Sequence, residues 1–248
     1  MNSIQHFVDG KIFKGTSKRT GKVFNPATGE QSSEVNLATT DDVNKIVSIA
    51  NKAFISWSQK TPLFRARVLF KFKELIEKNS DELTRIIVSE HGKVYEDAKG
   101  SLTRGLEVVE FACGIPQLLK GEFTENVGTN VDSWSVRQPL GVCAGITPFN
   151  FPAMVPMWMF PIAIACGNTF ILKPSEKDPS CSMRLAELFL EAGLPPGVFN
   201  VINGDKEAVD AILNNKDIAA VSFVGSTPIA KYIYENCAKN EKRVQALG

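Results

Sequence analysis

The hydrophobic and polar positions of the first 120 residues predict mainly helices. Apolar side chains recur every three or four residues in four segments, so that each segment has one apolar face. Thr40 or Asp41 can cap the first segment, and Pro62 suits the first turn of the second. We therefore predict helices at Asp41–Trp57, Pro62–Lys78, Ser80–His91 and about Glu96–Leu119, preceded by short strands and turns over residues 4–35.

From residue 141 onward, short apolar runs that fit strands alternate with single helical segments. Strands separated by one helix each predict right-handed crossovers and an open parallel sheet with helices on both faces, an α/β fold. Residues 121–139 alternate in polarity and predict an antiparallel β-ribbon that protrudes from the core. The predicted strands are 141–147, 169–173, 198–202 and 218–224, and the predicted helices are 153–166, 180–192, 206–215 and 228–238.

The stretch from Gly141 to Leu172 contains no Asp, Glu, Lys or Arg. A charge-free stretch of this size fits either a membrane span or the buried centre of an enzyme. A membrane helix needs about 20 apolar residues in continuous helix, whereas four prolines interrupt this stretch, and Asn150 and Asn168 would be costly in hydrocarbon. We therefore predict a buried strand, helix and strand and no membrane span.

Composition excludes several other classes. The chain has 248 residues, of which 44% are hydrophobic and 22% charged, with a net charge of +1. A near-neutral, mixed distribution of charge gives no footprint for nucleic acid or acidic membranes. The first nine residues show neither the basic nor the apolar region of a secretory signal, and the five cysteines lack the paired spacing of a disulfide framework or a zinc site. We expect no metal, and a cytoplasmic protein.

Three segments that follow predicted strands carry candidate chemistry. Phe223-Val-Gly-Ser-Thr227 leads into a helix whose amino terminus suits an anion, or it is a plain turn. Lys173-Pro-Ser-Glu176 could hold two ribose hydroxyls by donor and acceptor together, or form a solvated turn. Asn150 lies between two Phe-Pro pairs, where its amide either holds the loop together or donates to a developing oxyanion.

In this order and spacing, Pro148-Phe-Asn-Phe-Pro152, Lys173-Pro-Ser-Glu176 and Phe223-Val-Gly-Ser-Thr227 resemble the aldehyde dehydrogenase superfamily over essentially the whole chain. The resemblance implies a Rossmann-like NAD-binding domain formed by residues 1–120 and 140–248, and an oligomerisation ribbon at 121–139. It also implies that Asn150 is catalytic as the side-chain half of an oxyanion hole. The cofactor-binding residues that it implies are Ile146, Thr147, Pro148, Phe149, Lys173, Ser175, Glu176, Gly225 and Ser226.

The chain departs from most members of the superfamily at Ala246, where the general base for thioester hydrolysis is usually a glutamate. Water needs such a base, whereas a thiol with a pKa near ~8.5 is already partly ionised. The substitution therefore suggests coenzyme A as the acyl acceptor. Together with Arg104-Gly-Leu-Glu107, it resembles the methylmalonate-semialdehyde dehydrogenase subfamily. That likeness implies that Arg104 binds the substrate carboxylate, although a surface pair with Glu107 would also explain it.

None of the five cysteines lies in the context of the family's nucleophile, so the chain resembles the amino-terminal half of such an enzyme, without the catalytic domain. The resemblance implies a homodimer or homotetramer when full length. The expected reaction is NAD-dependent, CoA-acylating oxidation of methylmalonate semialdehyde to propionyl-CoA, or of malonate semialdehyde to acetyl-CoA, with loss of CO2. Two alternatives stay open: a hydrolytic NAD-dependent aldehyde dehydrogenase and a non-catalytic nucleotide-binding module.

Overall fold

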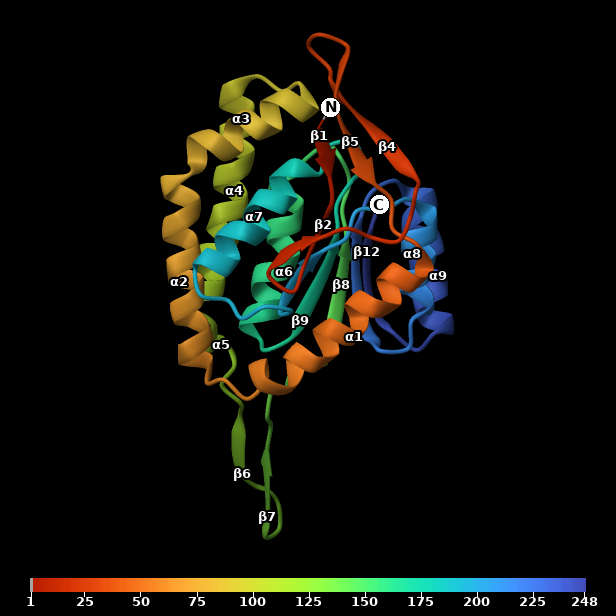
Figure 1. The fold of residues 1–248 in the computed structure, drawn as a ribbon. Helices are drawn as coiled ribbons and strands as arrows, with labels where there is room; N and C mark the ends of the chain where they lie inside the picture. The colour runs from red at the N-terminus through yellow and green to blue at the C-terminus, as the bar shows by residue number, and fades with distance from the viewer. Residues whose placement is uncertain (1) are drawn as a thin grey trace.

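A computed structural model describes residues 2–248, and a seven-stranded sheet lies at its centre (Figure 1). Its strand order is β12-β11-β8-β9-β10-β2-β3; the first five are mutually parallel, and β2 and β3 add an antiparallel edge. The parallel strands confirm the prediction of an open α/β sheet. The strands are β2 His6–Val8, β3 Lys11–Phe13, β8 Val142–Ile146, β9 Thr169–Lys173, β10 Phe199–Val201, β11 Ile218–Val224 and β12 Arg243–Leu247.

Helices cover both faces of this sheet because successive side chains of each buried strand point to opposite faces. Cys143, Phe170 and Leu172 join one hydrophobic cluster, whereas Val142 and Ile171 join the other. The first cluster contains residues of α2 (Pro62–Lys78), α3 (Ser80–His91), α4 (Tyr95–Cys113), α5 (Ile115–Leu118), α6 (Met154–Ala165) and α7 (Ser180–Glu191). The second contains residues of α1 (Thr40–Trp57), α8 (Lys206–Asn214) and α9 (Thr227–Lys239).

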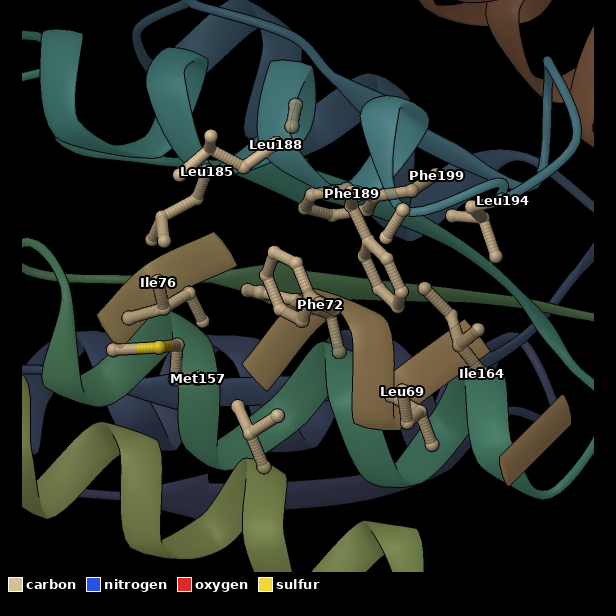
Figure 2. Packing of buried hydrophobic residues seen from close by; sticks show 14 of the residues in the cluster. Leu69, Phe72, Ile76, Met157, Ile164, Leu185, Leu188, Phe189, Leu194 and Phe199 are labelled. Carbon is tan, nitrogen blue, oxygen red and sulfur yellow. The ribbon is translucent and has the colours of Figure 1, made fainter. Parts of the chain in front are cut away.

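Aromatic rings fill the first cluster between α2, α6 and α7 (Figure 2). Phe72 of α2 stacks on Phe189 of α7 with 4.0 Å between ring centroids, and Phe160 of α6 stacks on Phe199 of β10 at 4.4 Å. Such pairs add about 1 kcal/mol each beyond the burial of their area. Helix α6, apolar around most of its surface, is thereby fixed beneath the sheet, as the charge-free stretch predicted.

Two smaller sheets lie outside this core. Strands β1 (Asn2–Ile4), β5 (Glu30–Asn36) and β4 (Thr20–Asn25) form one of them. Strands β6 (Phe123–Gly128) and β7 (Val131–Trp134) form a hairpin that projects far from the body (Figure 1). The hairpin confirms the predicted ribbon, and its Phe123 and Trp134 side chains are 66% and 71% exposed.

Two local expectations differ from the structure. The helix predicted to reach Leu119 ends at Cys113, and the single turn α5 follows Gly114. Pro116 has no N–H to continue the helical hydrogen bonding, which accounts for the break. Helix α1 is capped by Thr39 rather than by Thr40 or Asp41, and Asp42 completes a capping box with it. Across residues 2–248, the helices are too short or too polar to cross a bilayer.

Candidate functional site

Sheet register brings the carboxyl ends of four strands into one row. Ile146 of β8 pairs with Lys173 of β9 on one side and with Phe223 of β11 on the other, and Phe223 pairs with Ala246 of β12. After β8, the chain adds β9 and β10 on one side of β8, and it then returns to add β11 and β12 on the other side. The connections therefore leave β8 and β11 in opposite directions. Open α/β sheets bind ligands at such switch points.

A cavity of about 690 Å³ opens at this edge. Its size lies within the usual range for small-molecule sites, about 300–1,000 Å³. It contains eight of the nine cofactor-binding residues that the sequence suggested, and only Ser226 is absent from its lining. The lining residues are Ile146, Thr147, Pro148, Phe149, Lys173, Ser175, Glu176, Lys177, Asp205, Lys206, Val209, Phe223, Val224, Gly225, Pro228, Ile229 and Tyr232.

Lys173 and Glu176 form the charged pair of this cavity. The Lys173 ammonium lies 3.3 Å from a Glu176 carboxylate oxygen, and the side chains are 7% and 41% exposed. Burial lowers the pKa of Lys173, and the Glu176 charge partly offsets that effect. The pair therefore presents a donor and an acceptor side by side at the cavity wall.

Thr147 has unused hydrogen-bonding capacity in the same wall. Its backbone N–H donates to the Lys173 carbonyl at 3.1 Å, which continues the β8–β9 ladder past the strand end. Its hydroxyl is buried and has no hydrogen-bond partner within residues 2–248. A buried polar atom without a partner costs free energy, so this hydroxyl suits a polar ligand in the cavity.

The β11–α9 turn needs a glycine at position 225 because the Phe223 ring packs against it. A Cβ at Gly225 would lie 2.4 Å from the Phe223 ring, so that a side chain there would displace the wall. Ser226 is the N-cap residue of α9, but its side chain makes no capping hydrogen bond and is exposed. Its carbonyl accepts from the N–H groups of Ile229 and Ala230. Gly225, Pro228 and Ile229 line the cavity, so the N-terminus of α9 forms part of its wall, where an anion could bind.

The sequence reasoning missed the far wall, which α8 and α9 provide. Lys206 lies 2.5 Å from Asp210, and the Tyr232 hydroxyl donates to the other oxygen of the same carboxylate at 2.8 Å. Asp205 caps α8 and is held by Arg19 at 2.6 Å. Asp205, a capping residue before an amphipathic helix, could have been recognised in the sequence as the start of α8. The contact between Lys206 and Tyr232 could not, because it joins two helices that only the fold brings together.

Asn150 contradicts one expectation. The amide was expected in a buried, apolar setting, but the side chain is exposed and has no hydrogen bond to any part of the described chain. The reason is local, because the loop between β8 and α6 turns outward after Pro148 and Phe149 is 49% exposed. Phe149 lines the cavity, so Asn150 lies immediately next to it.

Arg104 lies on the exposed side of α4. Its neighbour Gly105 packs so closely on α6 that a Cβ there would lie 3.2 Å from the Met154 Cα. Helix α4 thus brings Arg104 to the end of α6 from which the Asn150 loop leaves. The pair with Glu107 that the sequence allowed does not form, and Arg104 makes no ion pair with residues 2–248.

The five cysteines are buried or partly buried, and burial keeps their thiols protonated. Burial raises the pKa of Cys113 to about 11 and of Cys143 to about 12, and it also raises the pKa of Cys166, Cys181 and Cys237. Because the thiolate is the reactive form, these thiols are poor nucleophiles near neutral pH.

A second cavity of about 370 Å³ shares Phe149 and Lys177 with the first. Asp178 lines it, and burial, reinforced by the nearby charge of Glu90, raises the pKa of this carboxyl to about 8. Glu90, whose pKa burial also raises, accepts from the Ser180 hydroxyl at 2.5 Å. Near neutral pH this region therefore holds less negative charge than its two carboxyls suggest.

Known proteins match the chain along its whole length. The sequence profile of the aldehyde dehydrogenase family matches residues 12–248. A malonate-semialdehyde dehydrogenase of Pseudomonas aeruginosa is 55% identical over 248 residues, which are 100% of this chain and 50% of that protein. Malonate-semialdehyde dehydrogenase 3 of Geobacillus kaustophilus is 52% identical over 245 residues, 99% of this chain and 51% of the relative.

Solved structures of semialdehyde dehydrogenases have the same fold as this chain. A methylmalonate-semialdehyde dehydrogenase from Oceanimonas doudoroffii superposes with a TM-score of 0.98 at 58% identity, covering 100% of this chain and 51% of that one. A candidate methylmalonate-semialdehyde dehydrogenase from Sinorhizobium meliloti 1021, in complex with NAD, gives 0.96 at 58% identity over 98% of this chain and 50% of the other. The chain spans about half the length of these relatives. Sequence, fold and the position of the cavity agree: the chain belongs to the aldehyde dehydrogenase family.

Proposed function

We propose that this chain is the cofactor-binding half of an NAD-dependent, CoA-acylating dehydrogenase of methylmalonate semialdehyde or malonate semialdehyde. The observation that carries the proposal is the cavity of about 690 Å³ at the switch point, with the buried Lys173 ammonium paired with Glu176 in its wall. The names of the relatives and the NAD complex of the Sinorhizobium protein support it. The products are propionyl-CoA or acetyl-CoA, with loss of CO2.

The cavity residues fit a dinucleotide. Lys173 donates to, and Glu176 accepts from, adjacent hydroxyls of a ribose, while the unpartnered Thr147 hydroxyl allows a further polar contact. A carboxylate at this position repels a 2′-phosphate, which favours NAD over NADP. Once bound, NAD supplies the hydride acceptor.

Asn150 acts as the side-chain donor to the oxyanion of the substrate. Its exposed amide follows Phe149 of the cavity wall, so that an N–H can reach a carbonyl at the cavity mouth. The attacking thiolate comes from a cysteine outside residues 1–248, because burial raises the pKa of all the thiols present here.

Ala246 determines the acyl acceptor in this proposal. It occupies the row of Ile146, Lys173 and Phe223 at the carboxyl edge of the sheet, where its methyl group provides no base. Water would attack a thioester slowly there, whereas the thiol of coenzyme A is partly ionised without help.

The test uses the full-length protein that contains this chain. With NAD and malonate semialdehyde, acetyl-CoA should form only when CoA is present, followed by NADH absorbance and by mass spectrometry of the product. Ala246→Glu should open a CoA-independent route to the free acid, and Ala246→Gln, which lacks the base, should not. Free acid formed by the unmodified protein at the same rate without CoA would contradict the proposal.

Arg104 binds the substrate carboxylate in this proposal. Arg104→Ala should raise KM for the semialdehyde acids at least about tenfold, as expected for a lost charge-assisted hydrogen bond, and should leave KM for propanal nearly unchanged. Steady-state kinetics on both substrates decide this, and equal changes in both would exclude the carboxylate role.

The ribbon at residues 121–139 joins subunits in this proposal, and the full-length protein is a cytoplasmic homodimer or homotetramer. The exposed apolar side chains of the hairpin support this assignment.

A further inference from the structure

The loop that carries Asn150 is held through the two phenylalanines beside it. The Lys93 ammonium lies 4.2 Å from the centroid of the Phe151 ring. The Lys177 ammonium lies 4.6 Å from the Phe149 centroid, and the His91 ring stacks on Phe149 at 6.2 Å. We call these residues the Phe–Asn–Phe clamp: His91, Lys93, Phe149, Phe151 and Lys177.

Within residues 2–248, the hydrogen bonds made by the backbone of this loop lie at its two ends. Thr147 is tied to β9, the Phe151 carbonyl accepts from the Val155 N–H at 3.3 Å, and the Pro152 carbonyl accepts from the Ser182 hydroxyl at 3.3 Å. Pro148 and Pro152 have no N–H to donate. Asn150 itself has no hydrogen bond within the described chain, so the rings on either side are the contacts that can restrict where its amide points.

The two lysines of the clamp differ in their surroundings, because Lys93 is largely buried and Lys177 is exposed. The Lys93 side chain is 11% exposed, and its ammonium also pairs with Asp97 of α4 at 3.3 Å. Lys177 lines both cavities together with Phe149, so that the Lys177–Phe149 contact forms the partition between them. A cation held over an aromatic face in partly desolvated surroundings attracts it more strongly than an exposed cation does.

We propose that Lys93 and Lys177 are positioning residues that orient Asn150 by fixing Phe151 and Phe149. The inference rests on the proposed role of Asn150 as oxyanion donor. Neither lysine needs to touch the substrate. A donor displaced by about 1 Å from its productive position loses much of its effect on the transition state, which lowers kcat more than it raises KM.

The test measures kcat, KM and NAD affinity of the full-length protein. Lys93→Met keeps most of the side-chain length and removes the charge, and it should lower kcat about tenfold with little change in KM or NAD affinity. Lys93→Arg keeps a cation over the ring and should retain most of kcat. The exposed Lys99 on α4 gives the matched control, and Lys99→Met should leave kcat unchanged. Hydrogen exchange of the Val155 amide, which donates to the Phe151 carbonyl, should be faster in Lys93→Met and unchanged in Lys99→Met.

A double-mutant cycle with Asn150→Ala separates the two proposals. If Lys93 acts through Asn150, Lys93→Met should lower kcat less than twofold once Asn150 is already alanine. An equal loss in both backgrounds, or an unchanged kcat in Lys93→Met, would overturn the positioning role while leaving Asn150 as donor. An unchanged kcat in Asn150→Ala alone would instead reject the oxyanion role, and the positioning role with it.

Discussion

At the scale of single residues, charges in unequal surroundings determine what the cavity can bind. Lys173 is buried and Glu176 is 41% exposed, so that the cation is fixed while the carboxylate stands at the solvent side of the pair. A second negative group about 6 Å from Glu176 would be repelled by roughly 3 kcal/mol at an effective dielectric constant of about 20. Solvent exposure reduces this to about 1 kcal/mol.

Glu176→Gln should therefore relax cofactor selectivity. We expect the ratio of NADP to NAD affinity to rise about fivefold, because a repulsion of about 1 kcal/mol corresponds to a factor of about five. Titration of each cofactor by fluorescence or calorimetry measures the ratio. Glu191→Gln, at the end of α7 and away from the cavity lining, should leave it unchanged. An unchanged ratio in Glu176→Gln would show that the ribose 2′-hydroxyl of the cofactor does not bind at Glu176.

His6 should make stability depend on pH. It is fully buried, its Nδ1 accepts from the Asn203 N–H at 3.1 Å, and burial lowers its pKa from 6.5 to about 4, against a smaller opposing effect of Asp42. The neutral ring is therefore favoured by folding. Its stabilising contribution is complete above about pH 6.5 and is lost as the pH falls toward 4.

The variant His6→Asn keeps an acceptor for Asn203 but does not titrate in this range. The free energy of unfolding of the wild type minus that of His6→Asn should fall by about 2 kcal/mol between pH 7 and pH 5, because the unfolded histidine gains protons that the folded one refuses. Denaturant unfolding at the two pH values measures this difference. A difference that does not change with pH would show that His6 titrates normally.

At the scale of elements, Gly105 allows helices α4 and α6 to pack closely against each other. A Cβ at Gly105 would lie 2.3 Å from Cε of Met157, whereas a Cβ at Gly100, on the same helix, would have no atom within 4 Å. The approach matters for the site because α4 carries Arg104 and α6 begins where the Asn150 loop ends.

Gly105→Ala and Gly100→Ala should have opposite effects on stability. The first should destabilise by about 1–3 kcal/mol, since overpacking outweighs the gain in helix propensity. The second should stabilise by up to about 1 kcal/mol through propensity alone. Thermal or denaturant unfolding compares them directly, and stabilisation by both would mean that α4 and α6 can separate without cost.

At the scale of the whole molecule, the β6–β7 hairpin projects with its apolar side chains uncovered. Under the proposed role of the ribbon, Trp134→Asp should weaken self-association of the full-length protein, because a charge would replace apolar area at the proposed subunit contact. Sedimentation velocity across a concentration series measures this. Ile55→Asp, at the same 71% exposure on α1, serves as the control and should leave the oligomer intact. Dissociation in both variants would contradict the proposal that the ribbon joins subunits.

Patterns within the chain determined the architecture. Helical periodicity, strand–helix alternation and the absence of charge from Gly141 to Leu172 led to the observed helices, parallel sheet and ribbon, because those elements depend on local hydrogen bonding and on which face is buried. The same patterns placed Lys173 and Gly225 at strand ends, where parallel strands bind ligands. The helix break at Gly114 was missed because it depends on one residue, Pro116.

Only the tertiary structure decided how residues far apart in sequence meet. It set Ala246, Phe223, Ile146 and Lys173 in one row, because register depends on pairing between strands as far apart in sequence as those of Ile146 and Phe223. It also turned Asn150 outward, brought Lys93 over the Phe151 ring and made Tyr232 a wall of the cavity. Such contacts follow from the packing of whole elements, which no local periodicity encodes.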